Sequence, residues 1–421
     1  MNHADNDILC RVEGDAPMGR LMRAHWLPAC MSEEVAERDG APVRARLLGE
    51  NMVVFRDSEG RLGALDEQCS HRRASLAFGR NEECGLRCLY HGWKFDVEGN
   101  VLEAASEPSG KAPVKAKAYP AREAGGFVWA WMGPKEDMRE MEPPAWAPKP
   151  GIRYAIVKIH AACNWAQVLE GSIDSAHSSS LHSTNMPAAQ DVYGSTATDS
   201  AWLRPSNDKA PRLQFQPTSY GFKYAAIRTP IKNADTHDYV RTTLYIAPFT
   251  VLIPPNNQYN LAQMLVPLDD VNTMFYWVAW HPDPAKGISQ QAWRRFCAAE
   301  VGIDVDRDFK KLRNLGNRYL QDREAMKRGD FTGIHGIPTQ DMAMWESMGP
   351  IVDRSQDHPG SSDMAVVQFR RMMVAAAKRL AEGGPAIGNT EPRIPHVQLA
   401  SFEGLIPKDT DWRTLSALQE A

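Results

Sequence analysis

The sequence predicts an α+β protein, in which an all-β N-terminal domain precedes a mixed domain built on an antiparallel sheet. A chain of 421 residues is longer than one hydrophobic core usually organises, so two domains are expected. Short extended runs between turns fill the first third, whereas helical and extended patterns both occur beyond residue 150. The segment EPPAWAPKP has four prolines, which neither a helix nor a central strand accommodates. We therefore predict a first domain over 1–141, a linker over 142–150 and a second domain over 151–421.

The expected strands of the first domain follow one another with little intervening sequence. Two turns are expected at Asp57–Gly60 and Asp96–Asn100, since Gly supplies positive φ and Asp or Asn caps the bend. The runs with strand character are 43–49, 51–57, 61–67, 86–96 and 125–133.

The second domain mixes both types of element. A helix is expected over 164–182, helix-rich sequence over 288–327 and a further helix over 364–382. The extended runs are 221–230, 239–248, 260–268 and 273–282, and their hairpin-like spacing indicates an antiparallel sheet.

Composition narrows the class of protein. A formal net charge of -4 gives no excess of Lys and Arg of the kind that a nucleic-acid surface needs. The longest apolar runs are too short to cross a bilayer, and the first residues lack a basic, apolar leader, so a soluble cytoplasmic protein is expected. The seven cysteines are odd in number, which favours free thiols or metal ligands over a disulfide framework.

The strongest chemical signal is a pair of short Cys/His motifs. Cys69 and His71 form C-x-H, and after sixteen intervening residues Cys88 and His91 form C-x-x-H. Four such ligands on two facing turns suit a structural zinc ion. The order favours a different interpretation: Cys comes first in each pair, so both thiolates can bind one iron and both imidazoles another. The nearby Cys84 has no place in this pattern.

A second constellation lies in EGSIDSAHSSSLH, residues 170–182. His177 and His182 stand about 140° apart on a regular helix, so both can face one ion only where the helix is distorted or ends. Two histidines and a carboxylate form the facial triad of non-haem Fe(II) oxygenases. Alone, such a pair is more often two exposed or satisfied histidines, and the metal interpretation gains its weight from the first motif.

These segments resemble a known family. CSHRR with CLYHGW resembles a Rieske [2Fe-2S] motif, and NWAQVLEGSIDSAHSSSLH resembles the iron-binding segment of the Rieske non-haem iron ring-hydroxylating oxygenases. GIPTQDMAMWESMGPIVDRSQDHP is similar to the phthalate dioxygenase branch of that family. The resemblance covers essentially the whole chain and implies a Rieske domain followed by a helix-grip type catalytic domain.

The resemblance also implies the ligands. Cys69 and Cys88 would bind one iron of the cluster, and His71 and His91 the other. His177 and His182 would bind a mononuclear Fe(II), together with a carboxylate far downstream. Asp341 lies in the segment that best matches the family, while Asp353, Asp357 and Asp363 are the other candidates for this ligand.

Further implications concern the electron path and the partners. Asp174 would connect His177 to His91 of an adjacent subunit, which requires a homotrimer or a stacked pair of trimers. A separate reductase with a flavin and a [2Fe-2S] cluster would supply electrons from NADH. The expected reaction is cis-dihydroxylation of an aromatic carboxylate by O₂, with phthalate favoured.

Several residues are candidates for binding the substrate or supporting the site. Arg204 and Arg241 are expected to bind two carboxylates, although a structural ion pair is as good an account of either arginine. Ser178 and Ser179 are expected to line the pocket, while Glu170 and Asn164 would support the iron-binding helix.

Two other functions stay open. One is a monooxygenase or O-demethylase of the same family that acts on a substituted benzoate. The other, of a different class, is a Rieske electron-transfer protein fused to a binding domain. The chain has no G-x-G-x-x-G fingerprint, which agrees with NADH binding to a partner.

Overall fold

The computed structural model describes residues 1–189, 202–255, 258–390 and 393–415. The chain divides into two compact units, one of Val12–Glu142 and the other of Met1–Arg11 with Pro143–Ala421. The change of unit at Glu142 falls where the Pro-rich segment begins. Residues 1–11, which the sequence placed in the first domain, group with the second, because helix α1 (His3–Cys10) packs on helices α3 (Trp165–Ile173) and α7 (Met364–Ala381).

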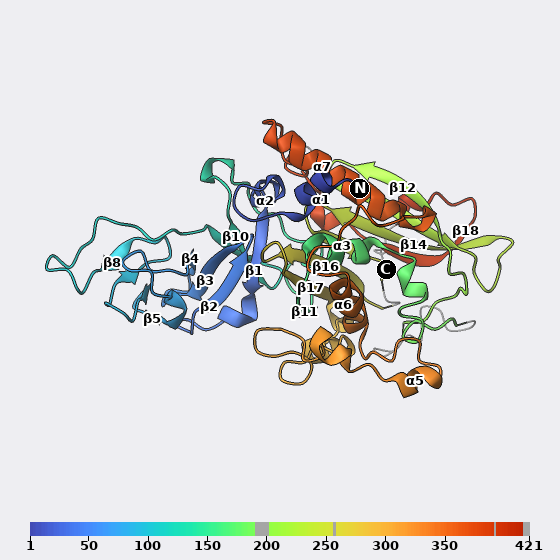
Figure 1. The fold of residues 1–421 in the computed structure, drawn as a ribbon, viewed down its shortest axis with the longest axis horizontal. Coiled ribbons are helices and arrows are strands. Elements are labelled where there is room, and N and C mark those ends of the chain that lie inside the picture. The colour runs from blue at the N-terminus through green and yellow to red at the C-terminus, as the bar shows by residue number, and fades with distance from the viewer. Residues whose placement is uncertain (190–201, 256–257, 391–392, 416–421) are drawn as a thin grey trace. The chain divides into compact units, whose positions relative to one another are not determined.

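The unit Val12–Glu142 consists of three small antiparallel sheets and helix α2 (Pro17–Arg23) (Figure 1). The sheet orders are β1-β10-β9, β2-β3-β4 and β5-β6-β7-β8. The strands are β1 (Trp26–Met31), β2 (Val43–Leu47), β3 (Glu50–Arg56), β4 (Leu62–Asp66), β5 (Arg80–Glu82), β6 (Gly85–Arg87), β7 (Lys94–Phe95), β8 (Val101–Glu103), β9 (Ala121–Ala124) and β10 (Phe127–Trp131). The predicted all-β character of this region is confirmed.

Both predicted turns of this unit form in the same way. Asp57 Oδ1 accepts hydrogen bonds from the amides of Glu59 and Arg61, and Asp96 Oδ1 accepts from those two and four residues further on. Gly60 has φ +86°, in the left-handed region that a side chain disfavours. The sequence therefore specifies these bends locally.

The larger unit is built on an eight-stranded antiparallel sheet. Its order is β11-β17-β16-β15-β14-β13-β12. Strand β18 pairs with residues 237–242 of β14, and β15 pairs with residues 244–246 of the same strand. The strands are β11 (Tyr154–Ala161), β12 (Arg212–Thr218), β13 (Gly221–Arg228), β14 (His237–Ile246), β15 (Thr250–Ile253), β16 (Asn260–Pro267), β17 (Thr273–Trp280) and β18 (Phe402–Pro407). All residues of β16 and β17 are buried, so both faces of these strands are covered.

Helix α3 packs on strands β15 to β17 and also contacts α6 (Ile337–Ser347) and α7. The Asn164 side chain caps its first turn by accepting from the amide of Ala166. The helix ends at Ile173, because Asp174 adopts an extended conformation and its Oδ1 accepts from the amide of Ala176. The predicted helix over 164–182 is thus too long: a 3-10 turn, His177–Ser179, follows after a break.

A close contact sets the distance between α3 and α6. The Trp345 ring of α6 covers Gly171 of α3 so tightly that a Cβ on Gly171 would lie 2.1 Å from Trp345 Nε1. Glycine is needed here for close approach rather than for flexibility. This contact fixes the helix that precedes His177 against the helix that carries Asp341.

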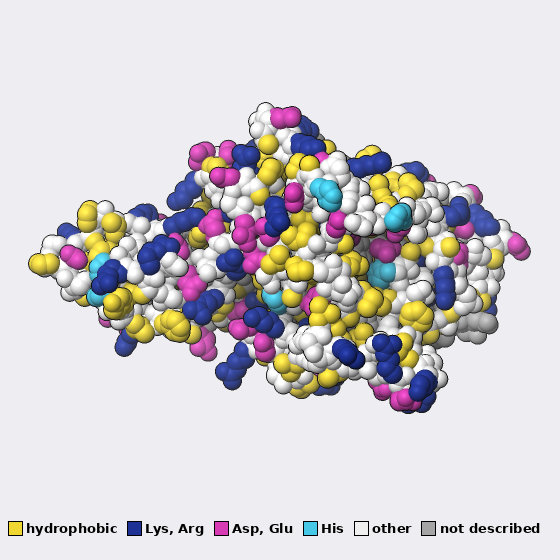
Figure 2. Space-filling model, viewed as in Figure 1, with side chains coloured by type: hydrophobic (Ala, Val, Ile, Leu, Met, Phe, Trp, Pro, Cys, Tyr) yellow, Lys and Arg dark blue, Asp and Glu magenta, His cyan; other side chains and the backbone are white. Residues whose placement is uncertain are grey.

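Helix α7 agrees with the prediction over 364–382. The segment 288–327 is less helical than expected: α4 (Gln290–Phe296) and α5 (Arg323–Lys327) are helical, whereas Leu315–Leu320 is an irregular 3-10 turn with a kink at Asn317–Tyr319. No helix among the described residues has the length and apolar character needed to cross a membrane. Acidic and basic side chains are interspersed over the face shown in Figure 2.

Candidate metal centres and active-site pocket

The four Cys and His residues of the first motif lie on two loops of the smaller unit. Cys69 and His71 follow β4, while Cys88 and His91 lie between β6 and β7. Each loop closes through the carbonyl of its cysteine, which accepts from the amide of Arg73 at 2.8 Å in one loop and from the amide four residues further on, at 3.0 Å, in the other. The two loops have the same architecture and bring like ligands together.

The thiols contact each other, and so do the imidazoles. Cys69 and Cys88 are buried, free and adjacent, and burial raises the pKa of the Cys69 thiol to about 11. The rings of His71 and His91 have centroids 4.6 Å apart. Trp93 stacks on His71 at 4.5 Å and fixes the plane of that ring. A cluster with one iron on two sulfurs and the other on two nitrogens requires this sorting of ligands.

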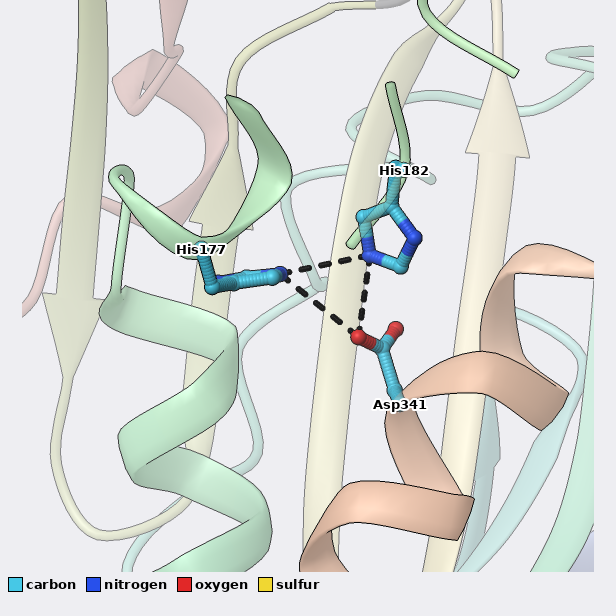
Figure 3. A group of neighbouring side chains, drawn as sticks. All are labelled: His177, His182 and Asp341. Carbon is cyan, nitrogen blue, oxygen red and sulfur yellow. Dashed lines mark hydrogen bonds and ion pairs between the residues drawn. The ribbon is translucent and has the colours of Figure 1, made fainter. Parts of the chain in front are cut away.

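The second constellation comes from two distant segments (Figure 3). His177 lies in the turn after α3, His182 follows five residues later, and Asp341 lies on α6. Nε2 of His177 is 3.3 Å from Nε2 of His182, and Asp341 Oδ1 lies 3.5 and 2.9 Å from these two nitrogens. The break after Ile173 brings both histidines to one side.

This donor set fits a single divalent ion. Ligand atoms about 2.1 Å from a metal at 90° to 110° from one another lie about 3.0 to 3.4 Å apart, close to the observed separations. Asp341 Oδ1 is buried and has no hydrogen-bond partner in the described chain. A buried carboxylate oxygen without a hydrogen bond is costly unless a cation compensates it. The residues therefore suit a 2-His-1-carboxylate metal site.

Asp174 lies on the other side of the His177 ring. Its Oδ2 is 3.6 Å from His177 Nδ1, longer than a hydrogen bond, and its side chain is 21% exposed. Burial acts to raise the pKa of Asp174, but contact with His177 and the amide of Ala176 lowers it overall. Asp174 is thus a carboxylate beside the triad and not part of it.

The other aspartates considered as the third ligand are engaged elsewhere. Asp353 is exposed and accepts from Ser355, and Asp357 pairs with Arg370. Asp363 accepts from the amide of Gly360. Within the described residues, Asp341 is the member of this set that meets the two histidines.

A pocket opens beside the triad, and the space within it and in its open mouth is together about 540 Å³. The residues of its wall that bear on function are His177, His182, Asp341, Asp174, Ser178, Arg204, Arg241, Gln263, Trp202, Trp277 and Trp345.

Both arginines expected to bind substrate reach this pocket. Arg204 is buried and donates to Ser178 Oγ at 2.9 Å, while its Nε has no partner among the described residues. Arg241 lies over the Trp202 ring, 5.5 Å from its centroid, and its Nε is 3.7 Å from the carboxylate of Glu403. Burial, followed by the adjacent Arg241, lowers the pKa of Arg204 to about 9. Arg204 and Arg241 are therefore close enough for each guanidinium to disfavour the positive charge of the other.

Not every expected pocket residue lies at the pocket. Ser178 lines it, whereas Ser179 is absent from the wall and its hydroxyl lies 3.5 Å from Arg228. Arg228 is buried and donates to the carbonyl of Ser175 at 2.7 Å, so it supports the loop that carries His177. Arg212 forms an exposed pair with Asp238. Ser179 is one position further along the 3-10 turn than Ser178, so its side chain points away from the pocket.

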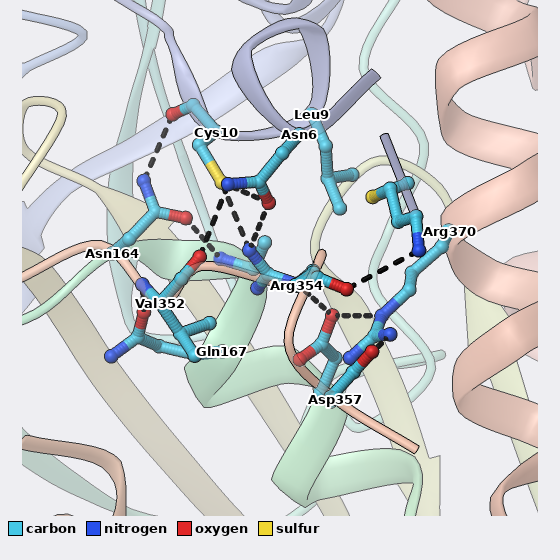
Figure 4. A network of polar contacts seen from close by, with 12 residues as sticks. Asn6, Leu9, Cys10, Asn164, Gln167, Val352, Arg354, Asp357 and Arg370 are labelled. Atoms are coloured by element: carbon cyan, nitrogen blue, oxygen red, sulfur yellow. Dashed lines mark hydrogen bonds and ion pairs between the residues drawn. The ribbon is translucent and has the colours of Figure 1, made fainter. Parts of the chain in front are cut away.

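Asn164, which is labelled in Figure 4, and Glu170 hold α3 in place. Asn164 Nδ2 donates to the carbonyls of Cys10 and Asp270. Glu170 Oε1 accepts from Nε of Arg354 and from Nε of Arg370, each at 2.7 Å. Both residues support the helix that precedes the triad, at a distance from the triad itself.

Sequence reasoning missed several residues at the site. Gln340 Oε1 lies 2.7 Å from His182 Nδ1, and Trp202, Trp277 and Gln263 line the pocket. Gln340 directly precedes Asp341, and that adjacency is the one signal in the sequence. Trp277 gives no signal, because a tryptophan in a strand such as β17 indicates a core position, and nothing in the sequence around Trp202 marks it as a pocket residue.

The two loops, the triad and the fold together define an iron-dependent oxygenase, and the comparisons identify the family. Residues 25–120 match the Rieske [2Fe-2S] domain, and residues 130–421 match the family described as LigXa C-terminal domain like. The chain belongs to the Rieske non-haem iron ring-hydroxylating oxygenases, as an oxygenase subunit.

Individual relatives agree with this family. The chain is 57% identical to the phthalate 4,5-dioxygenase oxygenase subunit of Pseudomonas putida, over 98% of this chain and 94% of the relative. It is 34% identical to the 3-chlorobenzoate-3,4-dioxygenase oxygenase subunit of Comamonas testosteroni, over 97% and 96%. Among solved structures, dicamba monooxygenase bound to dicamba has the same fold, with a TM-score of 0.60 at 17% identity over 86% of this chain and 98% of the other.

Proposed function

We propose that this chain is the oxygenase subunit that converts phthalate to its 4,5-cis-dihydrodiol, using O₂ and electrons that originate from NADH. The observation that carries the substrate is Arg204, a buried cation in the wall of the triad pocket whose Nε has no partner among the described residues. The relative at 57% identity, whose name states phthalate 4,5-dioxygenase, supports the same reaction.

A dicarboxylate suits the charge of the pocket. The buried guanidinium groups of Arg204, Arg228 and Arg241 lie near one another, and Glu403 lies within ion-pair distance of Arg241. Buried charges need partners, so a ligand with two negative charges is stabilised here. The rings of Trp202 and Trp277, with centroids 6.3 Å apart, provide apolar surface for the aromatic ring. The arginines would orient that ring toward the triad.

The metals are assigned to the two sites by their donor sets. Cys69 and Cys88 with His71 and His91 would hold a [2Fe-2S] cluster, and His177, His182 and Asp341 would hold Fe(II). When bound, these groups supply single-electron transfer and O₂ activation. The protein contributes the position of the substrate, the exclusion of water and the orientation of the ligands.

Asp174 is proposed to connect the two centres between subunits. Oδ2 lies beside His177 Nδ1, Oδ1 is held by the amide of Ala176, and the side chain stays partly exposed. A carboxylate so placed is open to an imidazole N–H from another subunit, which the resemblance identifies as that of His91. This role implies a homotrimer or a stacked pair of trimers.

The remaining partners are inferred from the family to which the chain belongs. An oxygenase subunit of a multicomponent system receives its electrons from a separate protein, and we propose a reductase with a flavin and a [2Fe-2S] cluster in a cytoplasmic setting.

Product analysis tests this proposal. The purified oxygenase, reductase and NADH would be supplied with ¹⁸O₂ and with phthalate, isophthalate, terephthalate or benzoate. We expect the fastest substrate-dependent O₂ uptake with phthalate, and two labelled oxygens on its ring. Uptake without coupled product from any of the three dicarboxylates would contradict the proposed substrate.

A monooxygenase is the second candidate, because several relatives have that kind of activity in their names. The chain is 32% identical to the tert-butanol monooxygenase / tert-amyl alcohol desaturase oxygenase subunit of Aquincola tertiaricarbonis and 29% identical to a 5,5'-dehydrodivanillate O-demethylase oxygenase subunit of Sphingobium. One labelled oxygen in the product, or release of formaldehyde from a methoxybenzoate, would favour this alternative over dioxygenation.

A further inference from the structure

Gln340 is the residue before Asp341 on α6, and its side chain is 2% exposed. Oε1 lies 2.7 Å from His182 Nδ1. The two N–H groups of Nε2 point toward three acceptors, Asn185 Oδ1 at 3.0 Å, Thr332 Oγ1 at 3.1 Å and the Ile334 carbonyl at 2.8 Å, so that one hydrogen atom is shared between two of them. Every polar atom of this buried amide therefore has a partner.

These contacts fix which way the amide points. The Ile334 carbonyl only accepts hydrogen bonds, so the amide atom 2.8 Å away must be the NH₂ group. With the amide reversed, its oxygen would face that carbonyl without a hydrogen atom between them. Oε1 consequently faces His182.

The orientation of the amide decides the tautomer of His182. Because Oε1 accepts only, the proton of the neutral imidazole must be on Nδ1. Nε2 is then left with its lone pair, and Nε2 is the atom that faces Asp341 Oδ1 at 2.9 Å and His177 Nε2 at 3.3 Å. A lone pair aimed at a carboxylate oxygen is repulsive unless a cation lies between them.

We propose that Gln340 is a positioning residue that holds His182 in the Nδ1–H tautomer and presents Nε2 to the mononuclear iron. One helix thus supplies a metal ligand, Asp341, and the residue that orients another ligand. Because the glutamine side chain is neutral, it orients His182 without adding a second negative charge beside the triad, whose only carboxylate remains that of Asp341. The Gln340 side chain is fixed in this orientation, because its NH₂ group is hydrogen-bonded to Asn185, Thr332 and Ile334.

This inference rests on the proposed ligand role of His182, and the test separates the two. The full-length protein with its cluster would be stripped of mononuclear iron by a chelator and titrated anaerobically with Fe(II). In Gln340→Met, which keeps the length of the side chain and loses the acceptor, we expect Fe(II) to bind about tenfold more weakly or worse. The amount of cluster, from its absorption and electron paramagnetic resonance, should not change.

Two further variants sharpen the result. Gln340→Glu keeps an acceptor toward Nδ1 and should retain Fe(II) affinity within about threefold of the parent, even though its contact with the Ile334 carbonyl becomes unfavourable. The matched control is Gln167→Met. Gln167 is another buried glutamine with three hydrogen bonds, to the Trp345 and Gly349 carbonyls and from the Val352 amide, but it contacts no member of the triad and is itself absent from the pocket wall. Its loss should lower the melting temperature and leave the Fe(II) affinity unchanged.

The outcomes distinguish both ideas. If His182→Ala still binds the third iron with parental affinity, the proposed metal site is wrong. If His182→Ala loses that iron while Gln340→Met binds it normally, the site stands and the role of Gln340 is refuted. If Gln340→Met does not accumulate as folded protein, Gln340→Glu decides: retained affinity supports the inference, and a tenfold loss overturns it.

Discussion

The carboxylate of Asp174 lies 3.6 Å from Nδ1 of His177, on the side of the imidazole away from the other candidate ligands. The two residues flank the break that ends α3, and the backbone amide of Ala176 fixes the carboxylate. One imidazole is thus placed between a carboxylate and a metal site. This placement is what the proposed electron path through Asp174 needs.

Asp174→Asn should leave both metal sites filled and nearly abolish product formation. The amide keeps the shape of the side chain but loses the negative charge that an imidazole N–H from another subunit would meet. Rapid-reaction spectroscopy of cluster oxidation in the presence of substrate and O₂ measures the affected step. Asp353→Asn, an exposed carboxylate away from the triad, is the control. Near-normal cluster oxidation in Asp174→Asn would remove this residue from the electron path.

Arg204→Gln should raise KM for phthalate by about tenfold or more, because a charged hydrogen bond in a desolvated pocket contributes about 1.5 to 3 kcal/mol. The effect on benzoate, which has one carboxylate fewer, should be smaller. Steady-state kinetics with both substrates measures this difference. Arg212→Gln removes an exposed guanidinium and should change neither KM. Equal losses for phthalate and benzoate would argue against paired carboxylate anchors.

Arg241→Met should affect stability as well as binding. Arg241 on β14 lies opposite Glu403 on β18, and its removal leaves that buried carboxylate without its cation, at a cost of about 3 to 5 kcal/mol. Adding Glu403→Gln should restore much of the unfolding free energy in urea while KM for phthalate stays high. If the double variant also recovers KM, Arg241 has only a structural role.

Asp341→Asn should reduce the iron content from about three to about two per chain, with the cluster intact. A neutral amide is a poor replacement for a carboxylate that completes a 2-His-1-carboxylate site. Metal analysis beside the cluster absorption measures both numbers. Asp363→Asn, one of the rejected ligand candidates, should keep the full iron content. Loss of iron from Asp363→Asn instead would reverse the assignment.

Gly171→Ala should destabilise the larger unit by about 1 to 3 kcal/mol. Alanine normally favours a helix by up to about 1 kcal/mol over glycine, but here the new Cβ would lie 2.1 Å from Trp345 Nε1. Urea unfolding should show the loss, whereas Ser172→Ala in the same helix should be nearly neutral. A more stable Gly171→Ala protein would mean that the Trp345 ring moves aside freely.

Much of the fold follows from local sequence. Alternating apolar residues and Asp/Gly turns specify the strands of the first unit, and the Asp57 and Asp96 bends form from contacts within five residues. The predicted helix after Asn164 is longer than the observed one. The spacing of apolar residues indicates which face of a helix is buried, but it does not show that Asp174 ends this helix.

The sequence by itself determined the ligand types and their grouping: two Cys/His motifs, a histidine pair and a downstream aspartate in a recognisable order. Tertiary structure decided which aspartate meets the histidines, which arginines enter the pocket, and that Ser178 rather than Ser179 lines it. It also revealed Gln340, whose role depends on a contact 158 positions apart along the chain. Such choices depend on how helices α3 and α6 pack across the Gly171 contact, and no local pattern encodes that distance.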